Sequence, residues 1–237
     1  FFLGGILSLL ISFKIFRINF IYPSFRVIKY HFLDGWHLFL STIGVNFYRE
    51  SNVIILGFIA GYKYVGIYAA AEKLIKAIQS LTIPIVNTLF PYFGRKLSDG
   101  NKASEFLRFN KIGKYYIILI FFIAVISFLF SEFIIQLVGK EYYASIPVFK
   151  YLCFVILIGG YNYYYGMLGL VNIGKDKDFT RYVWISGVLG VFSSIFLSYI
   201  LNEIGAAISV VIAEICLLFL ISNSIIKFQK QFRPESK

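Results

Sequence analysis

The chain has 237 residues, of which 59% are hydrophobic, and a formal net charge of +11. A soluble domain is closer to half apolar, whereas here long apolar runs recur, each able to cross a hydrocarbon core of about 30 Å. The cations lie in the segments between these runs, as the positive-inside rule expects, so the basic charge does not indicate nucleic-acid binding. These features predict an all-α, polytopic transmembrane helical bundle.

The first segment, residues 1–13, is apolar but shorter than the roughly 20 residues that a membrane span needs. We interpret it as the end of a truncated transmembrane helix, because it has neither the charged start nor the cleavage site of a signal peptide. Residues 14–31 are basic and aromatic, and Pro23 prevents one uninterrupted helix. They predict a linker on the cytoplasmic membrane surface, where aromatic rings insert and cations meet anionic lipid.

The bundle proper is predicted over residues 32–226. Pro84 should kink the second span, and Gly159 and Gly160 should interrupt the fourth. A polar, basic loop is expected at 94–114, a tight turn at 202–205, and a cytoplasmic tail at 227–237. The six complete spans are expected at about 32–60, 67–93, 115–133, 148–171, 182–201 and 206–226.

The distribution of lysine and arginine predicts the orientation of these spans. Cations are abundant in the 14–31 linker, the 94–114 loop, the 172–181 turn and the tail, while the opposite side carries only Lys63, Lys140 and, marginally, Lys150. Short loops rich in lysine and arginine stay in the cytoplasm. Both ends of the chain are therefore expected inside, which agrees with an even number of spans.

Arg49 and Glu50 lie deep in the first complete span. Charges at membrane depth are energetically costly, so they usually face an internal cavity and mark a substrate pathway. Adjacent helical positions point about 100° apart, so the two side chains should not pair with each other. We expect Arg49 to face a cavity; the alternative is a structural ion pair with a neighbouring span.

The second span adds Glu72, Lys73 and Lys76. Glu72 and Lys76 have the i,i+4 spacing that favours an ion pair, which leaves Lys73 without a partner in its own helix. Lys73, Lys76, Ser80 and Asn87 form one polar stripe, and such a stripe must face protein or water. We expect these cations to line an anion-accepting cavity, although they could instead lie near the outer mouth.

Two further candidates are polar groups inside later spans. Tyr161 and Tyr165 belong to a run of glycine, tyrosine and asparagine from 159 to 166 that could bind a sugar or could simply pack. Glu214 is an isolated carboxylate that could bind a proton or pair with a cation. Residues 169–175 fit the phosphate-loop spacing, but Asp176 replaces the Ser or Thr that would hold Mg²⁺, and no strand precedes it. The sequence shows no catalytic motif or metal-ligand spacing, and we expect neither enzyme activity nor a cofactor.

Several strings resemble the O-antigen and polysaccharide flippases of the multidrug/oligosaccharidyl-lipid/polysaccharide exporter superfamily, known as Wzx-like proteins. The most specific are VGIYAAAEKL at 65–74 and LFPYF at 89–93, with YRESNVIILG at 48–57 and Pro84 in support. Looser similarity covers the whole chain. In that family two pseudo-symmetric helical bundles form one transporter, so the resemblance implies that this chain is the C-terminal half.

The resemblance implies a flippase that moves undecaprenyl-diphosphate-linked oligosaccharide across the bacterial inner membrane by alternating access. Its cavity residues would be Arg49, Glu50, Glu72, Lys73, Lys76, Asn87, Tyr161, Tyr165 and Glu214. Its partners would be the lipid-linked oligosaccharide, membrane lipid, the missing N-terminal bundle and polysaccharide polymerase machinery. Three alternatives remain open: a multidrug or cation antiporter, which would favour acidic cavity groups; a membrane polysaccharide polymerase or ligase, which would need a larger external loop; and a scaffold whose charges are only structural.

Overall fold

A computed structural model describes residues 2–16, 22–99 and 102–230. All of its regular elements are helices in these ranges, which confirms the all-α prediction. The chain divides into two units, residues 1–36 and residues 37–237, and each is described by itself. The first unit holds α1 (Phe2–Phe16) and the beginning of α2 (Phe25–Ile59), with Pro23 just before the start of α2. The predicted linker is therefore helical from Phe25 onward, while residues 17–21 lie outside the described part of the chain.

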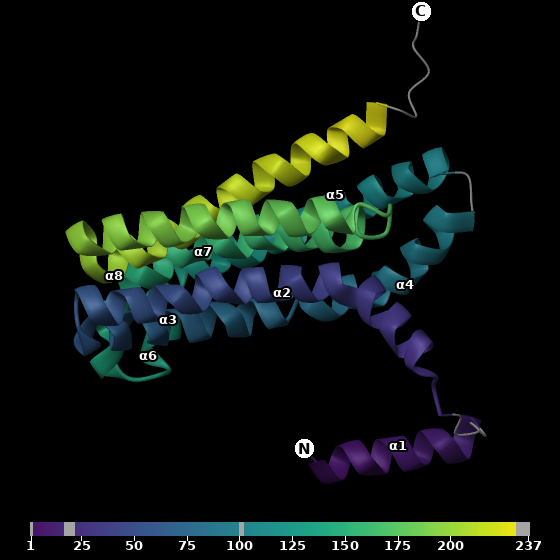
Figure 1. Cartoon of the computed structure of the whole chain (residues 1–237). Coiled ribbons are helices and arrows are strands. Elements are labelled where there is room, and N and C mark those ends of the chain that lie inside the picture. Colours follow the sequence, from purple (N-terminus) through teal and green to yellow (C-terminus); the bar gives the residue numbers. More distant parts are fainter. Residues whose placement is uncertain (1, 17–21, 100–101, 231–237) are drawn as a thin grey trace, which may run out of the picture. The chain divides into compact units, whose positions relative to one another are not determined.

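The second unit is a bundle of helices that run side by side (Figure 1). Its core divides into two clusters of buried side chains, one mainly aliphatic and the other richer in aromatic rings. After α2 its elements are α3 (Tyr62–Ser80), α4 (Ile83–Asp99), α5 (Lys102–Leu129), α6 (Ser131–Gln136), the 3₁₀-helix η1 (Lys140–Ser145), α7 (Ile146–Asn162), the π-helix η2 (Tyr163–Leu170) and α8 (Asp176–Lys230).

Three helices are long and apolar enough to cross a membrane in the described part of the chain, with boundaries at 104–129, 140–170 and 176–230. The pair α3–α4 adds a fourth if it forms one bent span. The helix α2 is not among them, because charged and polar side chains interrupt its apolar residues. The exact number of six complete spans stays a prediction.

The bend between α3 and α4 occurs close to Pro84, as the sequence predicts. The two helices meet at 42° across a short break, in which Thr82 Oγ1 donates to the carbonyl oxygen of Gln79 at 2.8 Å. Pro84 is the second residue of α4. The first turn of a helix tolerates proline, because its N–H groups have no partner inside the helix. The proline therefore starts a new helix here instead of kinking a continuous one.

Two expectations about interruptions are wrong. The segment 94–114, predicted as a loop, is helical up to Asp99 and again from Lys102, because α4 and α5 extend well beyond their apolar parts. Gly159 and Gly160 do not interrupt α7, which changes to a π-helix only at Tyr163. A Cβ on Gly160 would lie 2.8 Å from Ile120 Cδ1, so this glycine permits close packing of α7 on α5.

The helix α8 folds back on itself at the predicted turn. Asn202 has φ 49° and ψ −127°, far from helical values, and divides α8 into two antiparallel arms (Figure 1). A Cβ on Gly190 of the first arm would lie 3.0 Å from the Cβ of Ala213 on the second. Just after the turn, any side chain on Gly205 would overlap the backbone of Leu197. Only glycine permits this approach, which explains the short connection between the arms.

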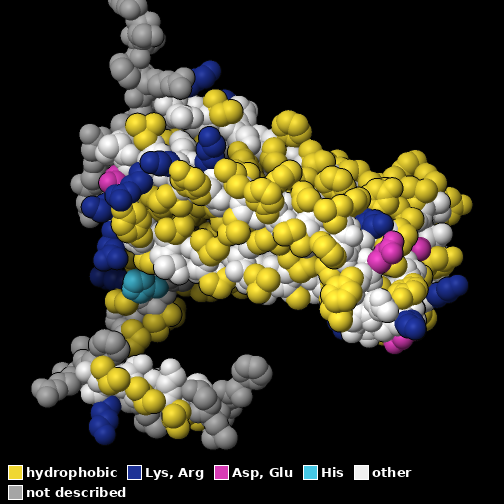
Figure 2. Space-filling view, turned by 180° about the vertical axis from the view of Figure 1, so that it is seen from behind, with side chains coloured by type: hydrophobic (Ala, Val, Ile, Leu, Met, Phe, Trp, Pro, Cys, Tyr) yellow, Lys and Arg dark blue, Asp and Glu magenta, His cyan; other side chains and the backbone are white. Residues whose placement is uncertain are grey.

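Packing brings the basic segments of the bundle together at one end. Phe106 near the start of α5 lies 5.4 Å from Phe228 near the end of α8, centroid to centroid, and Lys175 Nζ lies 5.8 Å from the centroid of the same Phe228 ring. The Arg108 Cζ atom lies 6.0 Å from the centroid of the Tyr92 ring on α4. Apolar side chains cover the middle of the bundle, while lysine and arginine gather toward one end (Figure 2). The predicted tail lies outside the described residues from 231 onward.

Candidate functional site

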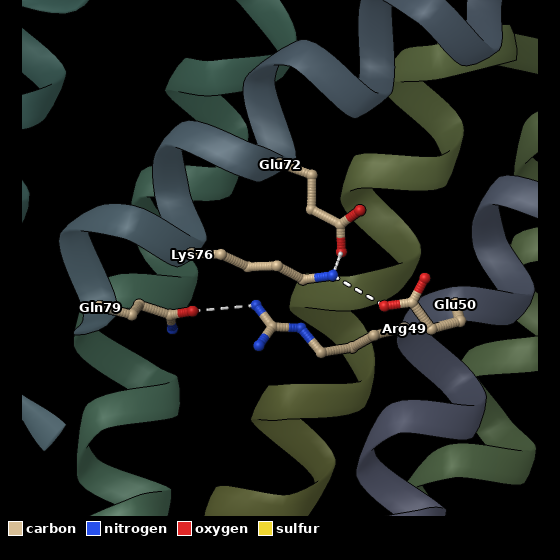
Figure 3. A network of polar contacts seen from close by, with 5 residues as sticks. All are labelled: Arg49, Glu50, Glu72, Lys76 and Gln79. Atoms are coloured by element: carbon tan, nitrogen blue, oxygen red, sulfur yellow. Dashed lines mark hydrogen bonds and ion pairs between the residues drawn. The ribbon is translucent and has the colours of Figure 1, made fainter. Parts of the chain in front are cut away.

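The charged side chains of α2 and α3 meet where the two helices pack together (Figure 3). Arg49 and Glu50 point apart, as their adjacent positions predict. Arg49 is half-buried, and its Nη2 donates to Oε1 of Gln79 on α3 at 3.0 Å. Glu50 is exposed and accepts from Lys76 Nζ at 2.9 Å. Each side chain therefore links α2 to α3 separately.

Lys76 forms ion pairs with two carboxylates. Besides Glu50 it contacts Glu72 at 3.1 Å, so the predicted i,i+4 pair is present. The Glu72 side chain is only 7% exposed, against 39% for Lys76 and 63% for Glu50. A buried carboxylate needs a compensating charge, and Lys76 supplies it. Much of the charge of Lys76 is therefore neutralised within the protein.

The other members of the predicted polar stripe lie on the outside of the bundle. Lys73 is exposed and forms no ion pair with any described residue. Ser80 donates to the carbonyl oxygen of Ala77 at 2.6 Å. Asn87 follows the α3–α4 break, and its Oδ1 accepts from the Tyr163 hydroxyl at 2.9 Å. The break therefore separates Asn87 from the stripe on α3 and places it beside the π-helix.

Tyr161 and Tyr165 lie in contact, with ring centroids 4.6 Å apart. Tyr165 is buried and packs edge-to-face on Phe109 of α5. Tyr161 is half-buried, and its hydroxyl is 2.8 Å from the Ser222 hydroxyl on α8. These contacts are those of packed side chains, which was one of the two interpretations that the sequence left open.

Glu214 is held inside the bundle by donors from two other helices. Its Oε1 accepts from the Tyr48 hydroxyl of α2 at 2.8 Å, and its Oε2 accepts from Asn162 Nδ2, at the end of α7, at 2.7 Å. Asn162 Nδ2 also lies 2.9 Å from the backbone oxygen of Glu214. Both donors are buried, and no ion pair to Glu214 occurs among the described residues. Glu214 therefore joins α2, α7 and α8 through hydrogen bonds.

Sequence reasoning missed Tyr48 and Gln79 as members of this region, and it noted Asn162 only as part of the run at 159–166. Gln79 accepts from Arg49 and donates through Nε2 to the backbone oxygen of Val155 at 3.1 Å. A Cβ on Gly159 would lie 3.1 Å from Gln79 Nε2 and 3.6 Å from Glu214 Cδ, so the two groups approach the same point on α7. The only signal in the sequence was that each is a polar group in an apolar stretch.

The accessible part of this region is basic. Six charged residues were predicted for the site, three cations and three carboxylates, but Glu72 and Glu214 are buried. Arg49, Lys73 and Lys76 are at least partly accessible, but Lys76 is paired with Glu50 and Glu72, so Arg49 and Lys73 are the cations of this group without an ion pair among the described residues. No group of three or more potential metal ligands occurs among the described residues. The arrangement can attract an anion but offers no nucleophile paired with a base.

Comparison with known proteins gives two kinds of match. A family model described as "Polysaccharide biosynthesis protein" matches residues 1–96. The chain is 26% identical over 196 residues to a protein of Escherichia coli (strain K12) named "Putative O-antigen transporter", a match that covers 82% of this chain and 47% of that protein. A protein of the same name from Shigella dysenteriae is 26% identical over 192 residues, covering 81% and 48%.

The chain thus spans about half the length of the curated relatives that it matches. No solved structure matches it. The two relatives carry the names of transporters rather than of enzymes, in agreement with the expectation from the sequence. The resemblance of this chain to the O-antigen and polysaccharide flippases, inferred from its sequence, is therefore confirmed.

Proposed function

We propose that this chain is part of a membrane flippase that exports lipid-linked oligosaccharide, and that the accessible face of α2 and α3 lines the path of the cargo. One observation carries the proposal: Arg49 and Lys73, two accessible cations without an ion pair among the described residues, lie on helices whose exposed side chains are largely apolar. Charges at membrane depth require water or protein on that side. A water-filled path beside α2 and α3 meets this requirement.

The charge of this face suits the expected cargo. A lipid-linked oligosaccharide of this class carries an anionic diphosphate, which a basic surface attracts and concentrates. Lys73 and Arg49 are the cations that would contact it, because no carboxylate is paired with either in the described residues. Lys76 acts as a positioning residue, since Glu50 and Glu72 hold it between the two helices.

The basic end of the bundle supports one orientation in the membrane. Placed in the cytoplasm, that end obeys the positive-inside rule and puts the end of α8 on the cytoplasmic side of the bacterial inner membrane. The cargo would then pass from the basic end toward the end that holds the Asn202 turn. Alternating access would need helices beyond those of this chain, which spans about half the length of the matched relatives.

Complementation tests the proposal. Arg49→Ala and Lys73→Ala are introduced into the full-length protein, in a bacterial strain that lacks its own flippase, and surface polysaccharide and protein abundance are measured. Lys63→Ala is the matched control, because Lys63 is also exposed on α3 but lies at its first turn. We expect Arg49→Ala and Lys73→Ala each to reduce surface polysaccharide at normal abundance, with lipid-linked oligosaccharide accumulating inside, while the control exports normally.

Normal export by both Arg49→Ala and Lys73→Ala would contradict the role of this face. Failure of the unmodified protein in every matched glycan strain would instead contradict polysaccharide export and favour an antiporter of the same superfamily. The two failures are distinguishable, because the second needs no variant.

A further inference from the structure

A groove lies between α5 and α7, away from the charged face of α2 and α3. Its volume is about 250 Å³. All of its lining residues are apolar: Phe121, Ala124, Val125, Phe128, Leu129, Cys153, Phe154 and Leu157. Ala124 and Cys153 are buried, while Phe121, Phe154 and Leu129 are 49%, 52% and 70% exposed. Small side chains therefore form the floor, and large side chains stand at the rim.

The groove belongs to helices that are long and apolar enough to cross a membrane. Its lining comes from the last part of α5 and from the middle of α7, so it lies toward the end of the bundle where α5 ends and α7 begins. An open apolar groove on such helices meets lipid hydrocarbon rather than water. Its volume and lining suit a single flexible hydrocarbon chain.

One cation stands beside this groove. Lys150 Nζ lies 5.9 Å from the centroid of the Phe128 ring, a lining residue. Its contact with Glu132 is long, at 3.9 Å, and the Glu132 side chain is 78% exposed. Such an exposed ion pair contributes little to stability, so an anionic group of a ligand could replace the Glu132 carboxylate with little loss of free energy. Lys150 lies one turn or less beyond the groove residues of α7, nearer the end of the bundle.

We propose that this groove binds one acyl chain of an anionic phospholipid, whose phosphate contacts Lys150. The apolar lining takes the hydrocarbon, and the lysine selects the charge of the headgroup. Long lysine side chains near the ends of membrane helices extend toward the headgroups in the same way. The site differs from the face assigned to the cargo and does not depend on that assignment.

Quenching of tryptophan by brominated lipid tests this proposal. In the full-length protein, all native tryptophans, Trp36 and Trp184 included, are replaced by phenylalanine, and Phe154→Trp is introduced at the rim. The protein is reconstituted into vesicles with increasing fractions of brominated phosphatidylglycerol in phosphatidylcholine. Phe192→Trp is the matched control, because Phe192 is 68% exposed on α8 and does not line the groove.

We expect the fluorescence of the Phe154→Trp variant to be half-quenched at a lower fraction of brominated phosphatidylglycerol than that of the Phe192→Trp control, which should follow the bulk lipid. Lys150→Gln should weaken this preference about fivefold, corresponding to the roughly 1 kcal/mol that one lysine near a membrane surface contributes. Lys140→Gln removes a charge at the same end of the bundle and should leave the preference unchanged. Ala124→Leu should fill the floor of the groove and abolish the preference of the Phe154→Trp site for brominated phosphatidylglycerol.

Equal quenching at the two positions would overturn the proposal. A preference for phosphatidylglycerol that survives Lys150→Gln would also overturn it. So would stronger quenching of the Phe154→Trp variant by a brominated polyprenyl phosphate but not by brominated phosphatidylglycerol. Should Phe154→Trp fail to fold, the thermal midpoint of the natural protein provides the second measurement. Phosphatidylglycerol should raise that midpoint more than phosphatidylcholine does, and Lys150→Gln should remove the difference.

Discussion

Replacing Tyr48 by phenylalanine removes a single hydroxyl from the interior of the bundle. That hydroxyl donates to Glu214 at 2.8 Å, and the Tyr48 side chain is almost fully buried. A hydrogen bond to a charged group contributes about 1.5–3 kcal/mol in soluble proteins, whereas hydrogen bonds inside membrane proteins average about 0.6 kcal/mol. We therefore expect Tyr48→Phe to lower the free energy of unfolding by about 1–2 kcal/mol.

A matched control is present one helix away. Tyr68 on α3 is also fully buried, but its hydroxyl, which has Asn52 as a polar neighbour, forms no hydrogen bond of good distance and angle with the described residues. Removing a hydroxyl that lacks a well-formed hydrogen bond also removes the penalty of burying it, so Tyr68→Phe should change the free energy of unfolding by less than about 0.5 kcal/mol or should stabilise the protein. Equilibrium unfolding by sodium dodecyl sulfate in mixed micelles, followed by circular dichroism, measures both.

The interaction itself can be isolated in a double-mutant cycle. Glu214→Met keeps a side chain of similar length and removes both acceptor oxygens. In this background Tyr48→Phe should lose its effect, which gives a coupling energy of about 1 kcal/mol or more. Equal losses for Tyr48→Phe and Tyr68→Phe, or a loss at Tyr48 that persists in the Glu214→Met background, would refute the reasoning.

Three further predictions use the same unfolding assay. Gly166→Ala should lower the free energy of unfolding by about 1–3 kcal/mol, because its Cβ would lie 2.5 Å from the Phe179 ring. Gly66→Ala, with open space around it, should instead raise the free energy of unfolding by about 0.5–1 kcal/mol. Equal effects of the two substitutions would contradict the packing. Lys76→Met should lower the free energy of unfolding by about 1–2 kcal/mol, a figure reduced for the partial exposure of Lys76, because buried Glu72 loses its compensating charge. Glu50→Gln should change the free energy of unfolding by no more than about 0.5 kcal/mol. A larger loss for Glu50→Gln would show that Glu50, and not Glu72, is the main partner of Lys76. Asn202→Gly should stabilise by about 1 kcal/mol, because glycine adopts φ 49° and ψ −127° without strain, and destabilisation would contradict the turn geometry.

The features that the sequence predicts correctly depend on residues close together in the chain. The Glu72–Lys76 pair follows from helical spacing, the turn at Asn202 from a short polar interruption, and the bend before Pro84 from the chemistry of proline. The extent of α4 and α5 was underestimated, because apolar runs mark the part of a helix in lipid and not its ends.

The partners of buried polar groups could not be predicted in the same way. Glu214 meets Tyr48 across 166 positions of sequence, and Gln79 reaches Val155 across 76. Such contacts depend on how whole helices pack, which a single sequence does not encode in any local pattern. The π-helix at Tyr163 is another example, since nothing in the tyrosine-rich string distinguishes it from an ordinary helix.

The sharp reversal of α8 has a consequence for how the chain is made. Asn202 is the only residue with non-helical backbone angles between the two arms, and Gly205 already touches Leu197. With so little chain between them, the two arms should enter the bilayer together as a helical hairpin. The two arms should therefore leave the translocation machinery as a pair, and a charge placed in either arm should delay the insertion of both.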